Sequence, residues 1–195
     1  MKKRKNLLFV LPFFVAACNN SETKDSVEIA DSLNKAKSEK ADSLGKYSAD
    51  AATSEFLVSA VNGGMTEVQM GQLASEKSTN KKVREMGEMI VMDHNAANSQ
   101  VRSLAAQRKV SLPAMVGEDK QKTIDDLSAK KGKDFDKAFI SQMVKDHEDA
   151  IKLFKNATDK VNDTEVRNFA NNTLPKLQMH LDSFKVVQKM IKERF

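Results

Sequence analysis

The sequence predicts an all-α protein in which four long helices form an up-down bundle, with a short crossover helix between the second and the third. Two observations lead to this prediction. Gly and Pro are scarce, Trp is absent and Met is frequent, a composition typical of helical proteins rather than of β-sandwiches. In addition, apolar residues recur at alternating spacings of four and three along four long segments, which is the pattern by which helices pack in an antiparallel bundle.

The first two long helices are expected over residues 54–77 and 81–109. Ser54 and Asn80 stand at their starts, and each side chain can accept a hydrogen bond from an exposed N–H group of the first helical turn. The inward faces carry Phe56, Ala60, Gly63, Glu67, Met70 and Ala74 on the first helix, and Val83, Gly87, Ile90, His94, Ala97, Val101 and Leu104 on the second. Each face is apolar except at one titratable position, so both faces are expected to be buried.

The connection that follows contains helix breakers and one short helix. Pro113 and Gly117 interrupt the helical pattern, which resumes over about residues 118–130. The third long helix is expected over residues 133–158, and the fourth from about residue 164 to the end of the chain. Their inward faces carry Asp136, Ile140, Met143, His147, Ala150 and Phe154 on the third helix, and Val166, Ala170, Thr173, Leu177, His180, Phe184, Val187 and Ile191 on the fourth.

A short phrase occurs twice in the chain. Residues 90–97 read IVMDHNAA and residues 143–150 read MVKDHEDA. Each copy lies inside a predicted long helix and places a histidine, His94 or His147, on the apolar face of that helix. The phrase therefore marks corresponding points on the second and third long helices.

Four titratable residues are expected to converge inside the bundle. The chain has only three histidines, and His94, His147 and His180 all lie on apolar helix faces, while Glu67 takes the equivalent place on the first long helix. The four residues stand at similar depths along their helices, and mid-helix residues of a bundle meet at one level whichever way the helices run. A lone buried carboxylate or imidazolium is costly to desolvate, so the four must satisfy one another, hold water or bind an ion.

One interpretation of this cluster is a metal site. Three imidazoles and one carboxylate match a first-row divalent transition metal in ligand type and number, with Zn or Cu ahead of Fe. A ferritin-type di-iron centre needs Glu-x-x-His on two helices, but Val91, Val144 and Leu177 stand three residues before the histidines. The sequence thus argues against a di-iron centre and against ferroxidase activity.

The other interpretation is a structural one, in which Glu67 and the histidines form a hydrogen-bonded polar core without a metal. The protein would then be a spacer or a partner-binding module. Asp93 and Asp146 each precede a histidine by one residue, about 100° around the helix, so we expect them to face elsewhere as surface or inter-helix hydrogen-bonding groups. The sequence leaves both interpretations open.

The N-terminus indicates export and a lipid anchor. Residues 1–17 combine a positively charged start with a short apolar run, as in a signal peptide. The run ends in VAAC, which resembles the lipobox of bacterial lipoproteins, so Cys18 is expected to be lipidated and to hold the protein on a membrane of the cell envelope. Residues 18–49 are polar and are expected to form a flexible tether, and residues 50–195 the helical bundle.

Charge and motifs exclude several functions. The formal net charge of +5 falls to +1 without residues 1–17, which gives no electrostatic argument for a nucleic-acid partner. The chain contains no nucleophile–base arrangement, Gly-rich phosphate loop or Cys-based metal motif, so it favours a non-enzymatic role. Its one expected partner is the membrane, and no protein partner is indicated.

The helical segments resemble a known bacterial family. The phrases are FLVSAVNGGMTEVQMGQLA (56–74), MIVMDH (89–94), FDKAFISQMVKDH (135–147) and LPKLQMH (174–180). Together they resemble the DUF4142 family, whose members are often labelled outer-membrane proteins, over about residues 50–192. The resemblance implies a ferritin-like four-helix fold and export, and it points to Glu67, His94, His147 and His180 as the polar positions of the family. It implies no function.

Overall fold

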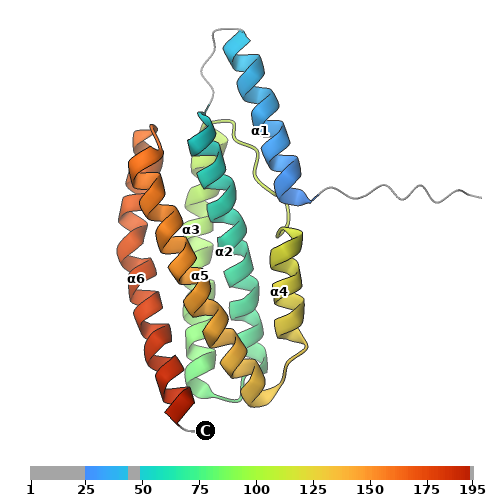
Figure 1. Ribbon diagram of the computed structural model, residues 1–195, viewed down its shortest axis with the longest axis vertical. Helices are drawn as coiled ribbons and strands as arrows, with labels where there is room; N and C mark the ends of the chain where they lie inside the picture. Colours follow the sequence, from blue (N-terminus) through green and yellow to red (C-terminus); the bar gives the residue numbers. More distant parts are fainter. Residues whose placement is uncertain (1–24, 44–48, 194–195) are drawn as a thin grey trace, which may run out of the picture.

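The protein is all-helical, as the sequence predicts. The computed structural model describes residues 25–43 and 49–193, and within these ranges it contains six α-helices and no strand (Figure 1). The helices are α1 (Ser26–Ser43), α2 (Ala51–Lys77), α3 (Lys81–Gln107), α4 (Glu118–Ser128), α5 (Gly132–Lys160) and α6 (Thr164–Glu193). None of them combines the length and the apolar character that crossing a bilayer requires.

The starts of the first two long helices follow from their capping residues. The Asp50 side chain accepts a hydrogen bond of 2.6 Å from Thr53 N, so α2 begins three residues before the expected Ser54. Asn80 caps α3 as predicted, because its side chain accepts a hydrogen bond of 2.9 Å from Lys82 N. Aspartate and asparagine are both strong N-caps. Because Asp50 lies upstream of Ser54 and caps the helix, α2 begins earlier than expected.

The four long helices pack in the order α2, α3, α6, α5 around a shared core, with α4 lying on α2 and α5. The expected alternation of direction along the chain is wrong, because α3 and α5 run the same way while α2 and α6 run oppositely to them (Figure 1). The physical reason is the crossover, residues 108–131, in which α4 carries the chain back along the bundle. Each helix is nevertheless antiparallel to its two neighbours.

The expectation of a flexible tether over residues 18–49 is wrong for residues 26–43. That segment forms α1, which packs against α2 and against the loop after α3 (Figure 1). Asn34 binds this loop twice, since its Nδ2 donates to Ser111 O at 2.9 Å and its Oδ1 accepts from Ser111 N at 2.6 Å. Ala30 is buried beside it. Paired hydrogen bonds to a loop backbone thus dock a helix whose apolar stripe looked too sparse to pack.

Asp25 joins α1 to the crossover. One carboxylate oxygen accepts a hydrogen bond of 2.6 Å from Val27 N in the first turn of α1. The other accepts one of 2.6 Å from Glu118 N, at the start of α4, where the N-cap Gly117 has no side chain to offer. The backbone hydrogen bonds, foremost that from Glu118, lower the pKa of Asp25. One carboxylate therefore caps two helices.

Two glycines let α2 and α3 approach closely. A Cβ added to Gly71 would lie 2.9 Å from the carbonyl oxygen of Gly87, and one added to Gly87 would lie 2.6 Å from that of Gly71. This close approach brings the inward faces of α2 and α3 together beside Glu67.

The core consists of two apolar clusters. One includes Phe56, Phe154 and Phe169, and the other lies toward the opposite end of the bundle and includes Phe135, Phe139, Phe184 and Met143. Polar side chains from all four long helices separate them, and these side chains form the candidate site.

Candidate metal centre

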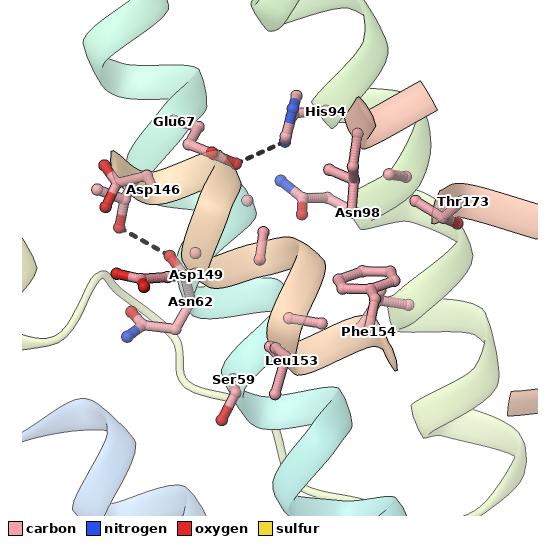
Figure 2. A pocket seen from close by; sticks show the side chains of 18 of the residues that line it. Ser59, Asn62, Glu67, His94, Asn98, Asp146, Asp149, Leu153, Phe154 and Thr173 are labelled. Carbon is pink, nitrogen blue, oxygen red and sulfur yellow. Dashed lines mark hydrogen bonds and ion pairs between the residues drawn. The ribbon is translucent and has the colours of Figure 1, made fainter. Parts of the chain in front are cut away.

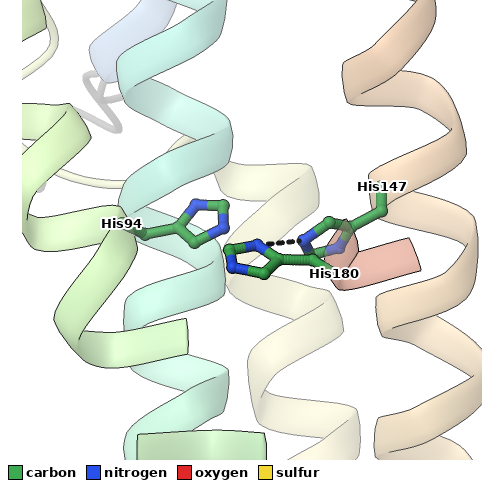
Figure 3. Close-up of side chains that lie close together, drawn as sticks. All are labelled: His94, His147 and His180. Carbon is green, nitrogen blue, oxygen red and sulfur yellow. Dashed lines mark hydrogen bonds between the residues drawn. The ribbon is translucent and has the colours of Figure 1, made fainter. Parts of the chain in front are cut away.

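Each long helix contributes one residue to a buried polar layer. Glu67 comes from α2, His94 from α3, His147 from α5 and His180 from α6, with exposed fractions of 4%, 7%, 0% and 1%. The three imidazole rings face one another in the centre of the bundle (Figure 3), with ring centroids 5.4–5.5 Å apart. The predicted convergence of these four residues is confirmed.

The hydrogen bonds of His147 fix its tautomer. Its Nδ1 lies 2.9 Å from the carbonyl oxygen of Met143, one turn earlier in α5. A carbonyl oxygen can only accept, so Nδ1 carries the hydrogen and a neutral His147 has its lone pair on Nε2. That nitrogen faces Nδ1 of His180 at 3.3 Å (Figure 3).

His180 is held by a carboxylate. Its Nε2 lies 2.9 Å from Oδ2 of Asp93, whose other oxygen accepts a hydrogen bond of 2.9 Å from Lys176. The carboxylate is ionised and can only accept, so Nε2 of His180 carries the hydrogen and Nδ1 carries the lone pair. Two lone pairs, on His147 and His180, therefore face each other at 3.3 Å. Such an arrangement needs a proton or a cation between them.

His94 has one nitrogen bonded and one free. Its Nδ1 donates to Oε2 of Glu67 at 2.8 Å (Figure 2). Its Nε2 is buried and has no hydrogen-bond partner. Oε1 of Glu67 also accepts no hydrogen bond, because the nearest donor, Nδ1 of His147 at 3.3 Å, already donates to Met143. The layer is thus incomplete as a hydrogen-bond network.

These contacts turn one ring nitrogen of each histidine toward the centre. The three nitrogens lie within 4.8 Å of one another. Two nitrogens that bind one tetrahedral ion at about 2.0 Å stand about 3.3 Å apart, which is the separation of His147 Nε2 and His180 Nδ1. His94 needs to move inward for an ion to contact all three. The residues present therefore fit a small divalent metal ion.

Glu67 lies behind His94 rather than in the group of possible ligands, which contains only His94, His147 and His180 among the described residues. A carboxylate that accepts the N–H of a metal-bound imidazole fixes the ring and raises its basicity. The structure places Glu67 in this orienting position for His94 and places Asp93 in the same position for His180.

The comparisons with known proteins identify the family. Residues 36–187 match the family described as "Domain of unknown function (DUF4142)". The chain belongs to this family. The match begins inside α1, upstream of the resemblance visible in the sequence. The search of curated proteins found no match.

Solved structures with a similar fold are known. The crystal structure of a DUF305 fragment from Deinococcus radiodurans has a TM-score of 0.66 at 13% identity, covering 74% of this chain and 99% of that one. CopM in the Cu(II)-bound form has a TM-score of 0.61 at 17% identity, and in the Cu(I)-bound form 0.60 at 15%. Each covers 70% of this chain and 95% of that one. At such identities the similarity shows a shared helical fold.

Burial and charge set the protonation of the layer in this DUF4142 protein. Burial alone would raise the pKa of Glu67, but the charges of the histidines, foremost His94, bring that pKa down to about 2. Burial alone would lower the pKa of His94, but the charge and hydrogen bond of Glu67 raise it. Burial lowers the pKa of His147. Burial also lowers the pKa of His180, to about 4, although the hydrogen bond to Asp93 acts to raise it. The histidine of the layer that most readily holds a proton is therefore His94, opposite an ionised Glu67.

A cavity of about 360 Å³ adjoins the layer (Figure 2). Glu67, His94 and His180 lie in its wall, whereas His147 does not. The cavity extends from the polar layer toward the cluster that contains Phe154 and reaches α1 and α4. A metal ion held by the histidines would thus have one side open to this space.

The two Asp-His pairs of the DUF4142 domain have different roles. Asp93 makes an inter-helix hydrogen bond, as predicted, but its partner is His180 of the cluster, so the expectation that Asp93 faces away from the cluster is wrong. Asp146 is buried and binds Lys120 and Gln142, at 3.1 and 3.0 Å. Sequence reasoning missed the support that Asp93 gives to His180, because the partner lies 87 positions away. The repeat of Asp-His was the only signal that singled out Asp93.

Proposed function

We propose that this protein binds one divalent transition-metal ion through His94, His147 and His180, with Cu or Zn preferred over Fe. One observation carries the proposal: three buried imidazoles are each held on one nitrogen by an acceptor and turn the other nitrogen toward a common point. In this proposal Glu67 orients His94 instead of serving as the fourth ligand that the sequence suggested.

The unsatisfied atoms of the layer support a bound cation. Nε2 of His94 is buried without a partner. Without a metal ion, the facing lone pairs of His147 and His180 are satisfied only if one proton lies between them. Buried polar groups without partners cost free energy. One metal ion would remove both defects, because it accepts the lone pairs of all three nitrogens.

The choice of metal follows from the ligands. Neutral imidazoles suit Zn and Cu, and the group contains no carboxylate, the ligand type that would favour Mg, Ca or Mn. The similar fold of CopM, whose structures hold Cu(II) and Cu(I), supports testing copper first. Three protein ligands leave one coordination position of a tetrahedral ion for water or another small ligand.

The proposed fold subclass is ferritin-like. Its support is the single long crossover between α3 and α5, which returns the chain along the bundle and is the connection typical of ferritin-like four-helix bundles. The Glu-x-x-His pairs of a di-iron centre do not accompany it, so the proposal includes no ferroxidase chemistry.

The test is a metal titration of protein purified without a polyhistidine tag. Elemental analysis and calorimetry should give one Cu or Zn ion per chain, and the melting temperature should rise with metal concentration because the ion binds only the folded state. His147→Ala should abolish binding. Substoichiometric metal, no titration heat and an unchanged His147→Ala variant would reject the metal site.

The second candidate is a structural or partner-interaction module whose polar layer needs no ion. The observation in its favour is that every histidine already makes at least one hydrogen bond within the bundle. On this hypothesis, joint replacement of the three histidines by Leu preserves or raises the melting temperature, since apolar groups of similar volume can replace a buried polar network. A large loss of stability in that variant would argue against it.

We also propose that the protein is exported and lipid-anchored. Residues 1–17 and Cys18 lie outside the described residues, and the support is the lipobox sequence alone. Because Asp25 is already docked on the bundle, the seven residue steps from Cys18 span at most about 25 Å, which would hold the domain near the membrane surface. Cys18→Ala should move the protein from the salt-washed membrane fraction to the soluble fraction. Retention in the membrane would refute the anchor.

A further inference from the structure

The wall of the cavity beside the histidines contains a polar side chain that makes no hydrogen bond to the described residues. Asn98 lies one turn after His94 on α3 and is 3% exposed, and no hydrogen bond joins its amide to any described residue. Figure 2 shows this amide projecting between His94 and Phe154. A Cβ on Gly64 would overlap Asn98 Oδ1, so a glycine makes room for the amide. The amide is open to the cavity, where it can hydrogen-bond water or a ligand.

The rest of the cavity wall is mainly apolar. Val101, Leu153, Phe154, Phe169 and Leu177 form the end away from the histidines. Small-molecule sites typically have volumes of about 300–1,000 Å³ and combine apolar walls with a few polar groups. The cavity, at about 360 Å³, lies within this range.

The charged groups of the wall are already paired. Glu67 lies 2.8 Å from His94. Lys176 lies 2.9 Å from Asp93, and Lys120 lies 3.1 Å from Asp146. Asp149 is paired at 3.0 and 3.1 Å with two lysines of its own helix. The wall therefore offers no unpaired charge to a bound ion, and an uncharged ligand enters at a lower desolvation cost.

We propose that this cavity binds a small uncharged molecule with an apolar body and one nitrogen lone pair, of the class of neutral aromatic azoles. The body lies among Phe154, Phe169 and Leu177, and Asn98 hydrogen-bonds the head group. In the metal-loaded protein the lone pair fills the open coordination position of the ion. That last contact rests on the proposed function, whereas binding in the cavity does not.

Gly63 provides the variant that tests occupancy. It lies in the cavity wall on α2, and a Cβ built there meets nothing within 4 Å. Gly63→Leu should therefore fill the space while leaving the histidines in place. Ser99→Leu adds the same side chain on the exposed surface of α3, outside the cavity wall, and is the matched control.

The probe is 4-phenylimidazole, titrated into the mature full-length protein in metal-free and Cu(II)-loaded forms. Calorimetry should give one site per chain in both forms, with at least tenfold tighter binding to the loaded form, where the Cu(II) EPR spectrum should change on saturation. Gly63→Leu should abolish the calorimetric binding of the probe and the EPR change, but it should bind the same number of copper ions per chain. Ser99→Leu should behave as wild type. Asn98→Leu should weaken binding about tenfold, since it keeps the volume and loses the hydrogen bond.

The outcomes separate the cavity from the metal. Equal probe affinity in wild type and in a folded Gly63→Leu variant would overturn the cavity proposal even if copper binds. Absence of copper binding would overturn the proposed function, and the cavity proposal would then stand or fall on the metal-free titration. If Gly63→Leu fails to fold, unchanged affinity in Asn98→Leu overturns the cavity proposal.

Discussion

Asp93 and His180 are joined across α3 and α6 by a hydrogen bond of 2.9 Å, so the aspartate of the first Asp-His pair supports a histidine of another helix and not its own neighbour. The aspartate of the second pair, Asp146, contacts none of the three histidines and binds Lys120 instead. The aspartates in the two copies of the sequence phrase therefore have different structural roles. Of the two aspartates, only Asp93 fixes the tautomer of a proposed metal ligand.

This difference predicts unequal effects of two matched substitutions. Asp93→Ala should weaken metal affinity about 10- to 100-fold, the usual effect of removing an acceptor behind a metal-bound histidine. Asp146→Ala removes the corresponding carboxylate and should leave the affinity unchanged, whatever it does to stability. Calorimetric titration of the folded variants measures both. Equal losses in the two variants would contradict the role of Asp93.

Metal binding should release a proton. Because the pKa of His94 is raised and those of His147 and His180 are lowered, the metal-free layer holds a proton most readily on His94. An ion that takes Nε2 of His94 displaces that proton, so a measurable number of protons per ion should be released at pH 6 and affinity should fall as pH falls. Titrations in buffers of different ionisation enthalpy measure this number. No release at pH 6 would mean that His94 is neutral or is not a ligand.

The sequence was sufficient to predict the four long helices, the short crossover helix and the convergence of the site. Helical spacing alone placed Glu67, His94, His147 and His180 on inward faces, and helix length placed them at one depth, because both depend on local periodicity. The roles within the site depend on contacts between helices. The contact of 2.8 Å by which Glu67 orients His94 in our proposal is not encoded by any spacing.

Two features of the fold escaped prediction for related reasons. The docking of α1 depends on hydrogen bonds between Asn34 and the backbone of Ser111, 77 positions away, and not on an apolar stripe. The direction of α5 depends on the path of residues 108–131. Periodicity identifies helices but says little about how a long connection runs.

Replacing glycine by alanine should have opposite effects on stability at Gly87 of α3 and Gly63 of α2. A Cβ at Gly87 would lie 2.6 Å from the carbonyl oxygen of Gly71, so Gly87→Ala should force the helices apart and cost about 1–3 kcal/mol. Gly63 is open, and Gly63→Ala should stabilise the helix by up to about 1 kcal/mol. Urea unfolding of both variants tests the pair. Stabilisation by Gly87→Ala would mean that α2 and α3 are not in this close contact.

The docking of α1 should depend on Asn34. Asn34→Ala removes both hydrogen bonds to Ser111 and leaves that loop backbone unpaired, so α1 should undock while the other helices stay folded. Hydrogen exchange should then accelerate in residues 26–43 and near residue 111. Lys35→Ala, at the adjacent exposed position, should leave exchange unchanged. Unaltered protection of α1 in the Asn34 variant would show that other contacts hold it.

The end of α3 and the start of α6 are joined by the buried guanidinium of Arg108. This contact should make the fold sensitive to acid. Arg108 Nε and Nη2 donate to Asp163 at 2.8 and 2.6 Å, and the Arg108 side chain is only 7% exposed. Asp163 also accepts a hydrogen bond of 3.1 Å from Val166 N in the first turn of α6. The hydrogen bond from Arg108, above other causes, lowers the pKa of Asp163.

A lowered folded-state pKa gives the sign of the pH effect. The stabilisation from Asp163 is complete above the ordinary aspartate pKa of about 3.9 and is lost as pH falls through the lowered value. Asp163→Asn should therefore cost about 1–3 kcal/mol at pH 7, and its difference from wild type should shrink below about pH 4. Glu165→Gln is the control, because Glu165 binds the same arginine from a side chain that is 68% exposed and should change stability by less than about 1 kcal/mol. Urea unfolding between pH 3 and 7 measures these differences in the free energy of unfolding. If the difference between Asp163→Asn and wild type does not change with pH, its cause is helix capping and not charge.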